Sequence, residues 1–289
     1  MKIHRSEFRV REDEKVDLDE RPTRVKPLYK SKDGYEKLLE TQKDELYHLQ
    51  NLQYAHDRYA LLVVFQAMDA AGKDGAIKHV MSGINPAGCQ VHAFKAPGPE
   101  ELEHDFLWRA AKALPERGRI GIFNRSYYEE VLAVRVHREF LEAQHLPAHV
   151  DDDGIWKERF ESIRQFEAHL HRNGTRVMKF FLHLSKDEQR ERFLARIDDP
   201  EKNWKMNPED VEVRKRWKDY MKAYEACLRA TSTKDAPWYV VPADDKQTAR
   251  LIIAQIIVQT MKTLKMSYPK ATPKRRRALQ ALRKDLAKD

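Results

Sequence analysis

Short apolar runs separated by longer amphipathic stretches are the main pattern along this chain. Residues 61–65 read Leu-Leu-Val-Val-Phe with no polar position, which is typical of a strand buried on both faces of a parallel sheet. Further apolar runs predict strands at residues 90–94, 119–123, 176–184 and 238–242.

The segments between these runs carry apolar residues at helical spacing. Leucines at positions 39, 46, 49 and 52 predict an amphipathic helix from Tyr35 to Arg58. Further helices are predicted from residue 77, at 100–114 and 156–172, after Ser185, and from Asn207. Strands that alternate with helices predict an α/β fold with a central parallel sheet and helices on both of its faces.

The loop after the first predicted strand, residues 70–75, reads Ala-Ala-Gly-Lys-Asp-Gly. Its glycines favour a tight turn, and a helix is predicted to follow, so backbone N–H groups converge here on an anion. The Lys73 ammonium adds a positive charge. The order of strand, Gly-Lys loop and helix therefore predicts a phosphate-binding loop. The alternative interpretation, a Gly-rich turn with a surface lysine and aspartate, is less favoured because a buried strand precedes the loop and a helix follows it.

This loop departs from the common phosphate-loop pattern, G-x-x-x-x-G-K-[ST], at two positions. Ala67 stands in place of the first glycine, and Asp74 replaces the hydroxyl residue that normally binds Mg²⁺. A second carboxylate, Asp69, lies inside this pattern, which spans residues 67–74. Two carboxylates beside bound phosphate indicate that they hold Mg²⁺, orient the attacking phosphate, or both.

A polar cluster follows another of the predicted strands. Ligands gather at the carboxyl ends of strands in open α/β sheets, so Asn124 and Arg125 should lie beside the first loop. Arg125 is suited to stabilise charge on a phosphoryl group during transfer, and its alternative role is an ion pair with a helix carboxylate. Because Asn124 is uncharged, it is poorly suited to act as a metal ligand or base. We assign that role to Asp69, Glu129 or Glu130.

Residues 185–205 are the most charged stretch of the body of the chain. Arg192 and Arg196 are four positions apart, on one face of the helix predicted after Ser185. Two guanidinium groups so placed can hold adjacent phosphates, whereas a solvated surface position is the simpler role for either one alone. The proline-containing segment that follows predicts a lid over the site, at about residues 190–220.

The net charge of +8 is concentrated at one end of the chain. Residues 262–289 contain ten Lys and Arg against two Asp, so the rest of the chain is neutral. Such a tail is usually solvated, although it can gather polyanions or nucleic acid without sequence preference.

The length of 289 residues and an apolar content of 41% suit one large domain. The sequence has no run of about 18 apolar residues and no secretory signal, so we expect a soluble cytoplasmic protein. Cys89 and Cys227 show no metal-binding spacing and are expected to be packed or free thiols.

Several segments resemble the polyphosphate kinase 2 family. They are residues 65–75, which include the Asp-Ala-Ala-Gly-Lys-Asp-Gly loop, residues 123–129, and residues 204–210 with the basic run at 214–217. The resemblance covers about residues 35–265. It leaves an extended charged arm at residues 1–34 and the basic tail at 266–289.

The resemblance implies a P-loop kinase-like three-layer fold with a helical lid. It also implies Mg²⁺-dependent, reversible phosphoryl transfer between inorganic polyphosphate and a nucleotide. Asn124 departs from the commoner Asp of the family. Members with Asn-Arg-Ser at this place resemble the class III type, which accepts both AMP and ADP and so can form ATP from AMP in two steps.

The residues and the resemblance together give the following expectations for the site. Asp69, Lys73 and Arg125 are catalytic. Ala70, Ala71, Gly72, Lys73, Asp74, Gly75, Arg125, Arg192 and Arg196 bind polyphosphate. Asn124, Tyr128, Glu129, Arg135 and Lys205 lie on the nucleotide side. Asp69, Glu129 and Glu130 hold Mg²⁺, for which Mn²⁺ can substitute.

The expected partners are inorganic polyphosphate, the nucleotides AMP, ADP and ATP, and further copies of the chain in a dimer or tetramer. No membrane and no specific nucleic acid is expected. Two other functions fit parts of the sequence. An ATP-dependent nucleoside or nucleotide monophosphate kinase shares the loop, the arginine and the lid, but should carry Ser or Thr instead of Asp74. A nucleic-acid-binding protein would use the basic tail.

Overall fold

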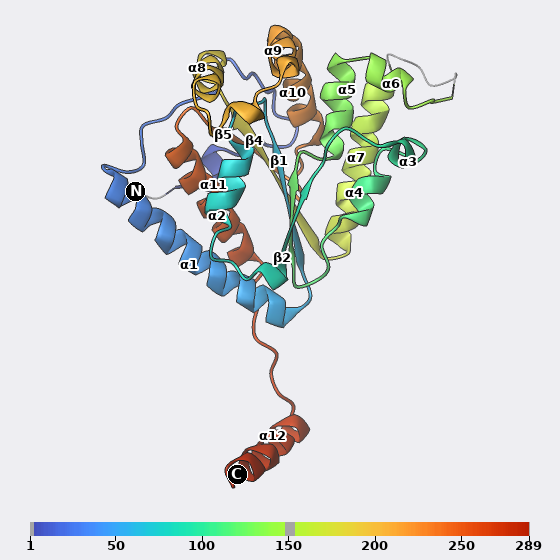
Figure 1. The fold of residues 1–289 in the computed structure, drawn as a ribbon. Helices are drawn as coiled ribbons and strands as arrows, with labels where there is room; N and C mark the ends of the chain where they lie inside the picture. Colours follow the sequence, from blue (N-terminus) through green and yellow to red (C-terminus); the bar gives the residue numbers. More distant parts are fainter. Residues whose placement is uncertain (1–2, 148–153, 289) are drawn as a thin grey trace.

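A five-stranded parallel sheet forms the centre of the computed structural model, which describes residues 3–147 and 154–288 (Figure 1). The strands are β1 (Ala60–Gln66), β2 (Cys89–Ala93), β3 (Ile120–Asn124), β4 (Thr175–His183) and β5 (Trp238–Pro242). Their order across the sheet is β2-β3-β1-β4-β5, and every neighbouring pair is parallel. The carboxyl ends of β1 and β3 therefore lie side by side.

The central strand β1 is buried along its whole length. Leu61, Val63 and Phe65 belong to the apolar cluster on one face of the sheet. Leu62 and Val64 belong to the cluster on the other face. This two-sided burial explains why the strand has an uninterrupted apolar sequence rather than an alternating one.

Helices cover both faces of the sheet (Figure 1), so the predicted α/β fold is confirmed. On one face lie α1 (Lys32–His56), α2 (Lys73–Val80) and α11 (Lys246–Thr263), and α11 packs against both of the others. On the other face lie α7 (Ile155–Arg172), α10 (Trp217–Thr231), α4 (Trp108–Lys112) and α5 (Ala133–Val136). The remaining α-helices are α3 (Pro99–Leu102), α6 (Glu139–Glu142), α8 (Lys186–Ile197), α9 (Pro208–Lys215) and α12 (Pro273–Leu286). The 3₁₀ helices are η1 (Arg5–Glu7), η2 (Pro86–Gly88), η3 (Tyr127–Val131) and η4 (Asn203–Lys205).

Most predicted elements are present, and two helices differ. The helix predicted from residue 77 begins earlier, at Lys73. The helix expected at residues 100–114 is two short helices, α3 and α4, because the Asp105 side chain accepts a hydrogen bond from the Leu107 backbone N–H (2.9 Å) and forms a turn between them.

Helix α7 ends as predicted, and Gly174 just beyond it has a φ of +90°. A Cβ there would lie 3.0 Å from the backbone oxygen of Arg58, so only glycine fits well.

The N-terminal arm is extended, but it is part of the core rather than separate from it. The Val10 backbone N–H donates to the Trp238 carbonyl (2.9 Å), and an antiparallel bridge joins the arm to β5. Val10, Val16 and Leu18 are buried. The sequence interpretation of a charged arm outside the core is therefore wrong, because it overlooked these scattered apolar residues.

The C-terminal tail forms α12, whose first turn is capped by the Thr272 side chain. None of its residues is buried, and an irregular linker separates this helix from the body of the protein (Figure 1).

Both cysteines are free thiols. Within the described ranges, no helix is long and apolar enough to cross a membrane.

Candidate functional site

The Gly-Lys loop turns sharply at the carboxyl end of β1. Ala70 and Gly72 adopt left-handed backbone conformations, with φ of +62° and +101°. The chain then enters α2 at Lys73, whose Nζ donates to the Ala67 carbonyl (3.0 Å). The free N–H groups at the start of α2 and the lysine ammonium thus lie at one edge of the sheet, where an anion can bind.

Lys73 is largely shielded from water, because only 9% of it is exposed. Burial lowers the pKa of Lys73, and the charge of Arg125 lowers it further. Three carboxylates oppose this effect on the pKa: Asp69, Glu129 and Asp74. A phosphate group at the loop would add more negative charge and favour the ammonium form.

The end of β3 is joined to this loop by two side-chain contacts. The Asn124 amide donates to Asp74 (2.6 Å), and the Arg125 guanidinium donates to Asp69 (2.9 Å). Arg125 has a φ of +61°, and its backbone N–H donates to the Phe65 carbonyl (3.0 Å). The two motifs predicted to lie side by side therefore do so, and each loop carboxylate contacts a residue from the other motif.

Glu129 also faces this cluster. Its Oε1 accepts a hydrogen bond from the Gln66 amide (3.0 Å), at the last residue of β1. The charge of Glu129 is the main reason why the pKa of Arg125 is raised, with Asp69 adding to the effect. Gln66 Oε1 is buried without a hydrogen-bond partner among the described residues. Glu129 and Gln66 therefore extend the polar site toward the centre of the sheet.

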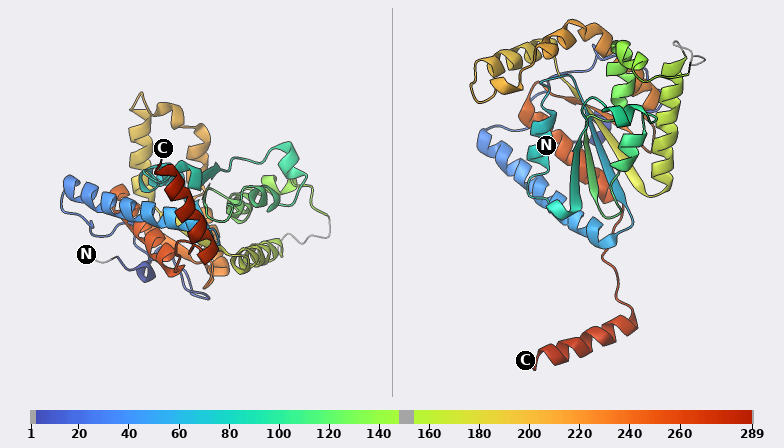
Figure 2. Two further views of the ribbon diagram at one scale, coloured as in Figure 1. Left: turned by 90° about the horizontal axis from the view of Figure 1, so that it is seen from below. Right: turned by 45° about the vertical axis from the view of Figure 1, so that its right-hand side comes forward.

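The predicted lid contains α8, η4 and α9, which arch over the carboxyl ends of the strands (Figure 2). The Gln189 amide on α8 donates to the Asp69 carbonyl (2.9 Å), and Arg214 on α9 donates to Gln189 (3.0 Å). Burial raises the pKa of Asp210, and the negative charge of Asp69 adds to this. The start of α9 thus faces the loop, while opening and closing of this segment stay a prediction.

Arg192 has a different place from the one expected. Its guanidinium is buried and donates to the carbonyls of Ala70 (3.0 Å) and Ala71 (3.0 Å), and also to Ala243 (2.7 Å) and Asp244 (3.1 Å). The geometry makes it a support for the loop backbone rather than a free group for polyphosphate. Arg196, one turn further along α8, is half-buried over the Phe193 ring.

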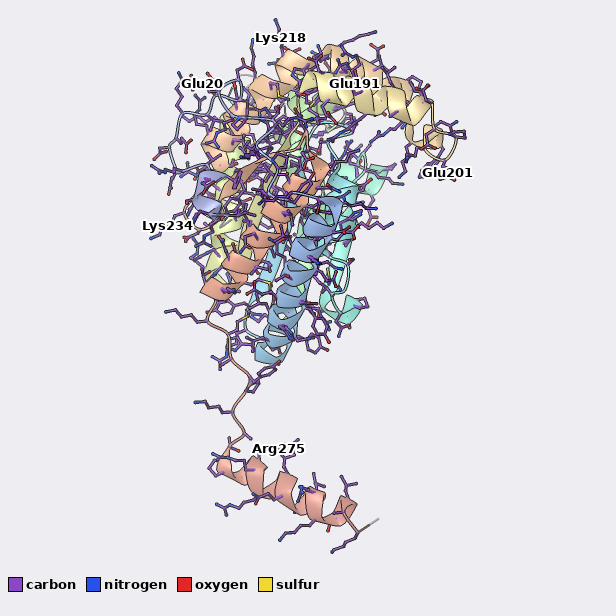
Figure 3. All side chains as sticks on the ribbon, turned by 90° about the vertical axis from the view of Figure 1, so that its left-hand side faces the viewer. Glu20, Glu191, Glu201, Lys218, Lys234 and Arg275 are labelled. Carbon is purple, nitrogen blue, oxygen red and sulfur yellow. The ribbon has the colours of Figure 1, made fainter. Side chains whose placement is uncertain are left out.

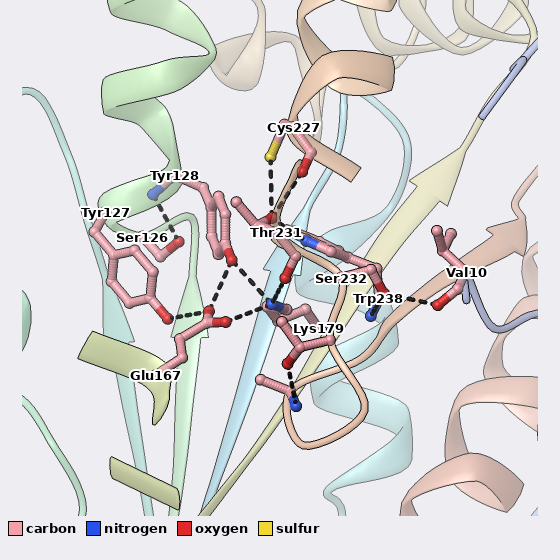
Figure 4. A network of polar contacts seen from close by, with 12 residues as sticks. Val10, Ser126, Tyr127, Tyr128, Glu167, Lys179, Cys227, Thr231, Ser232 and Trp238 are labelled. Carbon is pink, nitrogen blue, oxygen red and sulfur yellow. Dashed lines mark hydrogen bonds and ion pairs between the residues drawn. The ribbon is translucent and has the colours of Figure 1, made fainter. Parts of the chain in front are cut away.

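Tyr128 also lies away from the cluster, inside a closed polar network (Figure 4). The hydroxyls of Tyr127 (2.8 Å) and Tyr128 (2.7 Å) donate to Glu167, which pairs with Lys179 (2.5 Å). Lys179 also donates to the Thr231 carbonyl at the end of α10 (2.8 Å). The structure therefore does not support contact between Tyr128 and a nucleotide, since its only polar side-chain atom is fully buried and paired.

Three further expected residues lie outside the cluster. Glu130 is buried and pairs with Arg159 (3.2 Å), so it does not fit the role of metal ligand. Arg135 packs over the rings of Trp156 (5.8 Å) and Phe160 (5.9 Å). Lys205 is exposed in η4, with its ammonium over the neighbouring Trp204 ring (5.0 Å).

Carboxylate oxygens are available for a metal, but no ready-made metal cage exists. No group of three or more His, Cys, Asp or Glu side chains is placed to hold a metal ion within residues 3–147 and 154–288. Mg²⁺ usually takes one or two carboxylates, several waters and phosphate oxygens from the substrate. Asp69, Asp74 and Glu129 fit an ion that arrives with phosphate, and Asn124 can contact a metal-bound water.

Several residues near the site were missed from the sequence. Gln189 carries no motif that separates it from other polar residues of the lid, and Asp210 lies in the family-like segment 204–210 but was given no role in the site. Tyr220 and Tyr224 are buried on α10, and burial and then the charge of Glu129 raise the pKa of each. Their spacing of four residues marks a shared helix face and could have placed them together.

The parallel sheet, the Gly-Lys loop and the arginine at the end of β3 define a kinase-type phosphotransferase with a phosphate-binding loop. The model of the polyphosphate kinase 2 family matches residues 29–269. The chain therefore belongs to the polyphosphate kinase 2 family, and the predicted family and enzyme class are confirmed.

Named relatives and a solved structure agree with this family. The chain is 61% identical to the ADP-polyphosphate phosphotransferase of Rhodopseudomonas palustris, over 100% of both chains. It is 46% identical to the AMP/ADP-polyphosphate phosphotransferase of Meiothermus ruber, over 76% of this chain and 79% of that one. The crystal structure of polyphosphate kinase 2 from Arthrobacter aurescens TC1 matches with a TM-score of 0.83 and 39% identity, covering 92% of this chain and 93% of that one.

Proposed function

We propose that this protein catalyses reversible, Mg²⁺-dependent phosphoryl transfer between inorganic polyphosphate and the nucleotides ADP and AMP. The observation that carries the proposal is the pairing of the loop with the end of β3. Asp69 meets Arg125 (2.9 Å), and Asp74 meets Asn124 (2.6 Å). In an ATP-dependent kinase of this type, a hydroxyl residue would stand at Asp74 to bind the metal.

The loop and its neighbours account for the chemistry of transfer. Phosphoryl transfer needs mainly positioning and neutralisation of charge. Lys73 and the amides at the start of α2 would hold the bridging phosphates, and Arg125 would stabilise the phosphoryl group as it moves. Mg²⁺, held by Asp69 and Glu129, would neutralise further phosphate charge. Arg196 and the lid would contact the rest of the polyphosphate chain.

The acceptor specificity is the finer part of the proposal. The relative from Rhodopseudomonas palustris is named for ADP, and the one from Meiothermus ruber for both AMP and ADP. Asn124 supports acceptance of both nucleotides here, since an uncharged amide at the end of β3 adds no repulsion against an acceptor phosphate. AMP would then be converted to ATP in two steps.

A product assay tests the proposal. The protein is incubated with Mg²⁺ and polyphosphate, and with either AMP or ADP, and the nucleotides are separated over time. We expect ATP from ADP, and ADP followed by ATP from AMP, with both activities lost in Lys73→Ala and Asp69→Asn. Near-normal ATP formation by either variant would refute the site assignment. ATP formation from ADP with no product from AMP would refute only the dual specificity.

The cytoplasmic location and the homo-oligomer, a dimer or tetramer, belong to this proposal as expectations. Size-exclusion chromatography with light scattering measures the oligomeric state directly.

A further inference from the structure

A cleft lined by cations lies at the edge of the sheet opposite the phosphate loop. Its volume is about 580 Å³, and its lining includes Arg58, Tyr59, Arg176 and Lys265, with no carboxylate. Tyr59 directly precedes β1, Arg176 is the second residue of β4, and Lys265 follows α11. The cleft therefore lies at the amino ends of the strands, away from the reacting groups.

The cations of this cleft are not neutralised by the protein. Among the described residues, none of Arg58, Arg176 and Lys265 forms an ion pair with a carboxylate. Arg176 is held in place, because its guanidinium lies over the Tyr59 ring (5.2 Å) and donates to the His171 carbonyl (3.2 Å). Three uncompensated positive charges around one cleft make it a site for an anion.

The basic tail leaves the body directly from this cleft. His56, which also lines the cleft, has its Nδ1 3.0 Å from the Ser267 carbonyl oxygen. Beyond this contact, six basic residues on α12 are exposed with no acidic partner among the described residues: Lys274, Arg275, Arg276, Arg277, Arg283 and Lys284. Figure 3 shows their helix, marked by Arg275, with its side chains spread into open space. Lys270 lies in the linker between them, so the cleft, the linker and the tail all carry positive charge.

We propose that this cleft and the basic tail form a second binding site for inorganic polyphosphate, which holds a distant part of a long chain while one end reacts at the loop. The inference rests on the proposed function. A dense row of phosphates suits a row of cations that offers no base-specific groups. Single-stranded nucleic acid instead favours aromatic stacking platforms. The Tyr59 ring of the cleft is already stacked on His56 and lies under Arg176, and the tail has no aromatic residue after Tyr268.

The distance between the two sites sets the expected behaviour. They lie at opposite ends of β1, which has seven residues and is therefore about 23 Å long. A polyphosphate of a few units is too short to occupy both sites, whereas a chain of many tens of units can. Binding at the second site then raises the effective concentration of long chains at the loop.

The test compares a tail variant with a matched control of the same charge change. The tail variant carries Lys274→Gln, Arg275→Gln, Arg276→Gln and Arg277→Gln. The control carries Lys157→Gln, Arg164→Gln, Arg229→Gln and Lys234→Gln, all exposed residues outside the cleft and the tail. A third variant, Arg58→Gln, changes the cleft alone. For each protein, KM and kcat are measured with long and with short polyphosphate, at two salt concentrations.

We expect the tail variant to raise KM for long polyphosphate by about tenfold at low salt and to weaken its salt dependence. KM for short polyphosphate and kcat should stay within twofold of wild type, as should all constants of the control. Arg58→Gln should shift KM for long chains in the same direction by a smaller factor.

Equal KM values for long chains in the tail variant and wild type would overturn the inference and leave the proposed function intact. The inference also fails if single-stranded DNA of matched charge binds the wild-type tail more tightly than polyphosphate does. Absence of any turnover with polyphosphate in wild type would instead refute the proposed function itself.

Discussion

Two ion pairs near the end of β3 differ in the solvent exposure of their side chains. The side chains of Lys179 and Glu167 are 0% and 1% exposed, and their network is closed by two tyrosine hydroxyls and a backbone carbonyl. The side chains of Arg125 and Asp69 are 44% and 20% exposed. In the first pair, the protein supplies hydrogen-bond partners to both charged groups. The second pair is partly exposed, so its N–H groups and carboxylate oxygens can also contact a ligand.

This difference assigns separate tasks to adjacent residues. The closed network holds η3 against α7 and β4, because Tyr127 and Tyr128 are anchored through Glu167. Arg125 lies two residues before this anchor, so its backbone is placed while its side chain stays free to exchange partners. The fixed part of the site therefore lies beneath the residues that we propose to bind phosphate.

The largest expected effect comes from removing the open pair. Arg125→Ala should lower kcat with polyphosphate and ADP by about 10³, since it removes the guanidinium that we propose to stabilise the transferring group. The melting temperature should change little, because an exposed ion pair contributes less than about 1 kcal/mol. Steady-state kinetics and thermal unfolding of the same preparation check both parts. A large drop in melting temperature with kcat retained would reverse the roles of the two pairs.

Breaking the closed pair should act on stability instead. Lys179→Met leaves the Glu167 carboxylate buried and unpaired, and should reduce the free energy of unfolding by about 3–5 kcal/mol. Urea unfolding measures this loss. The matched control, Lys179→Met with Glu167→Leu, removes both charges and should recover most of the stability. A single variant as stable as wild type would show that the network does not anchor η3.

Arg192 and Arg196 repeat the comparison within one helix. Arg192→Ala removes the buried support of the Ala70 and Ala71 carbonyls, and should cost about 2 kcal/mol of stability. Arg196→Ala should leave stability unchanged and raise KM for polyphosphate. Urea unfolding and kinetics of the two variants distinguish them, and equal stability losses would contradict the separate roles.

The smallest expected effect concerns a buried histidine at the end of β4. Burial lowers the pKa of His183 from 6.5 to about 4, and the ring faces Arg21, Asp19 and Asp244. Between these two pKa values only the unfolded chain takes up the proton, so stability falls as the pH drops. The loss should be about 1 kcal/mol between pH 7 and pH 5.5.

The variant His183→Gln removes this titration. Its unfolding free energy should depend less on pH over that interval than the wild-type value does. Chemical unfolding at both pH values measures the difference, and parallel pH profiles would contradict the assignment.

The sequence predicts the frame of the fold well because β1, β4 and β5 are mostly apolar on both faces, a pattern typical of strands in a parallel sheet. The strand from Trp238 to Pro242 has the predicted bounds, and the helix predicted from Trp156 differs at its start by one residue. The Gly-Lys loop is recognisable because its glycines and lysine must stand in a fixed order.

The sequence does not predict which polar side chains turn inward. Glu129 and Glu130 are neighbours, yet Glu129 faces the loop and Glu130 pairs with the buried Arg159. The conformation of η3 sets the direction of each side chain, and so short an element has no periodic pattern in the sequence. In the sequence, nothing distinguishes Arg192 from a surface arginine. Only in the fold does it lie next to the Ala243 carbonyl, to which it donates. Long-range contacts of this kind depend on tertiary packing rather than on local pattern.

The most direct test of the account asks which donor the Gly72-Lys73 loop uses. Initial rates are measured with AMP as acceptor and Mg²⁺ present, with either polyphosphate or ATP as the phosphoryl donor. We expect kcat/KM to be at least about a hundredfold higher for polyphosphate, with that activity lost in Lys73→Ala. Efficient transfer from ATP with no transfer from polyphosphate would contradict the central claim.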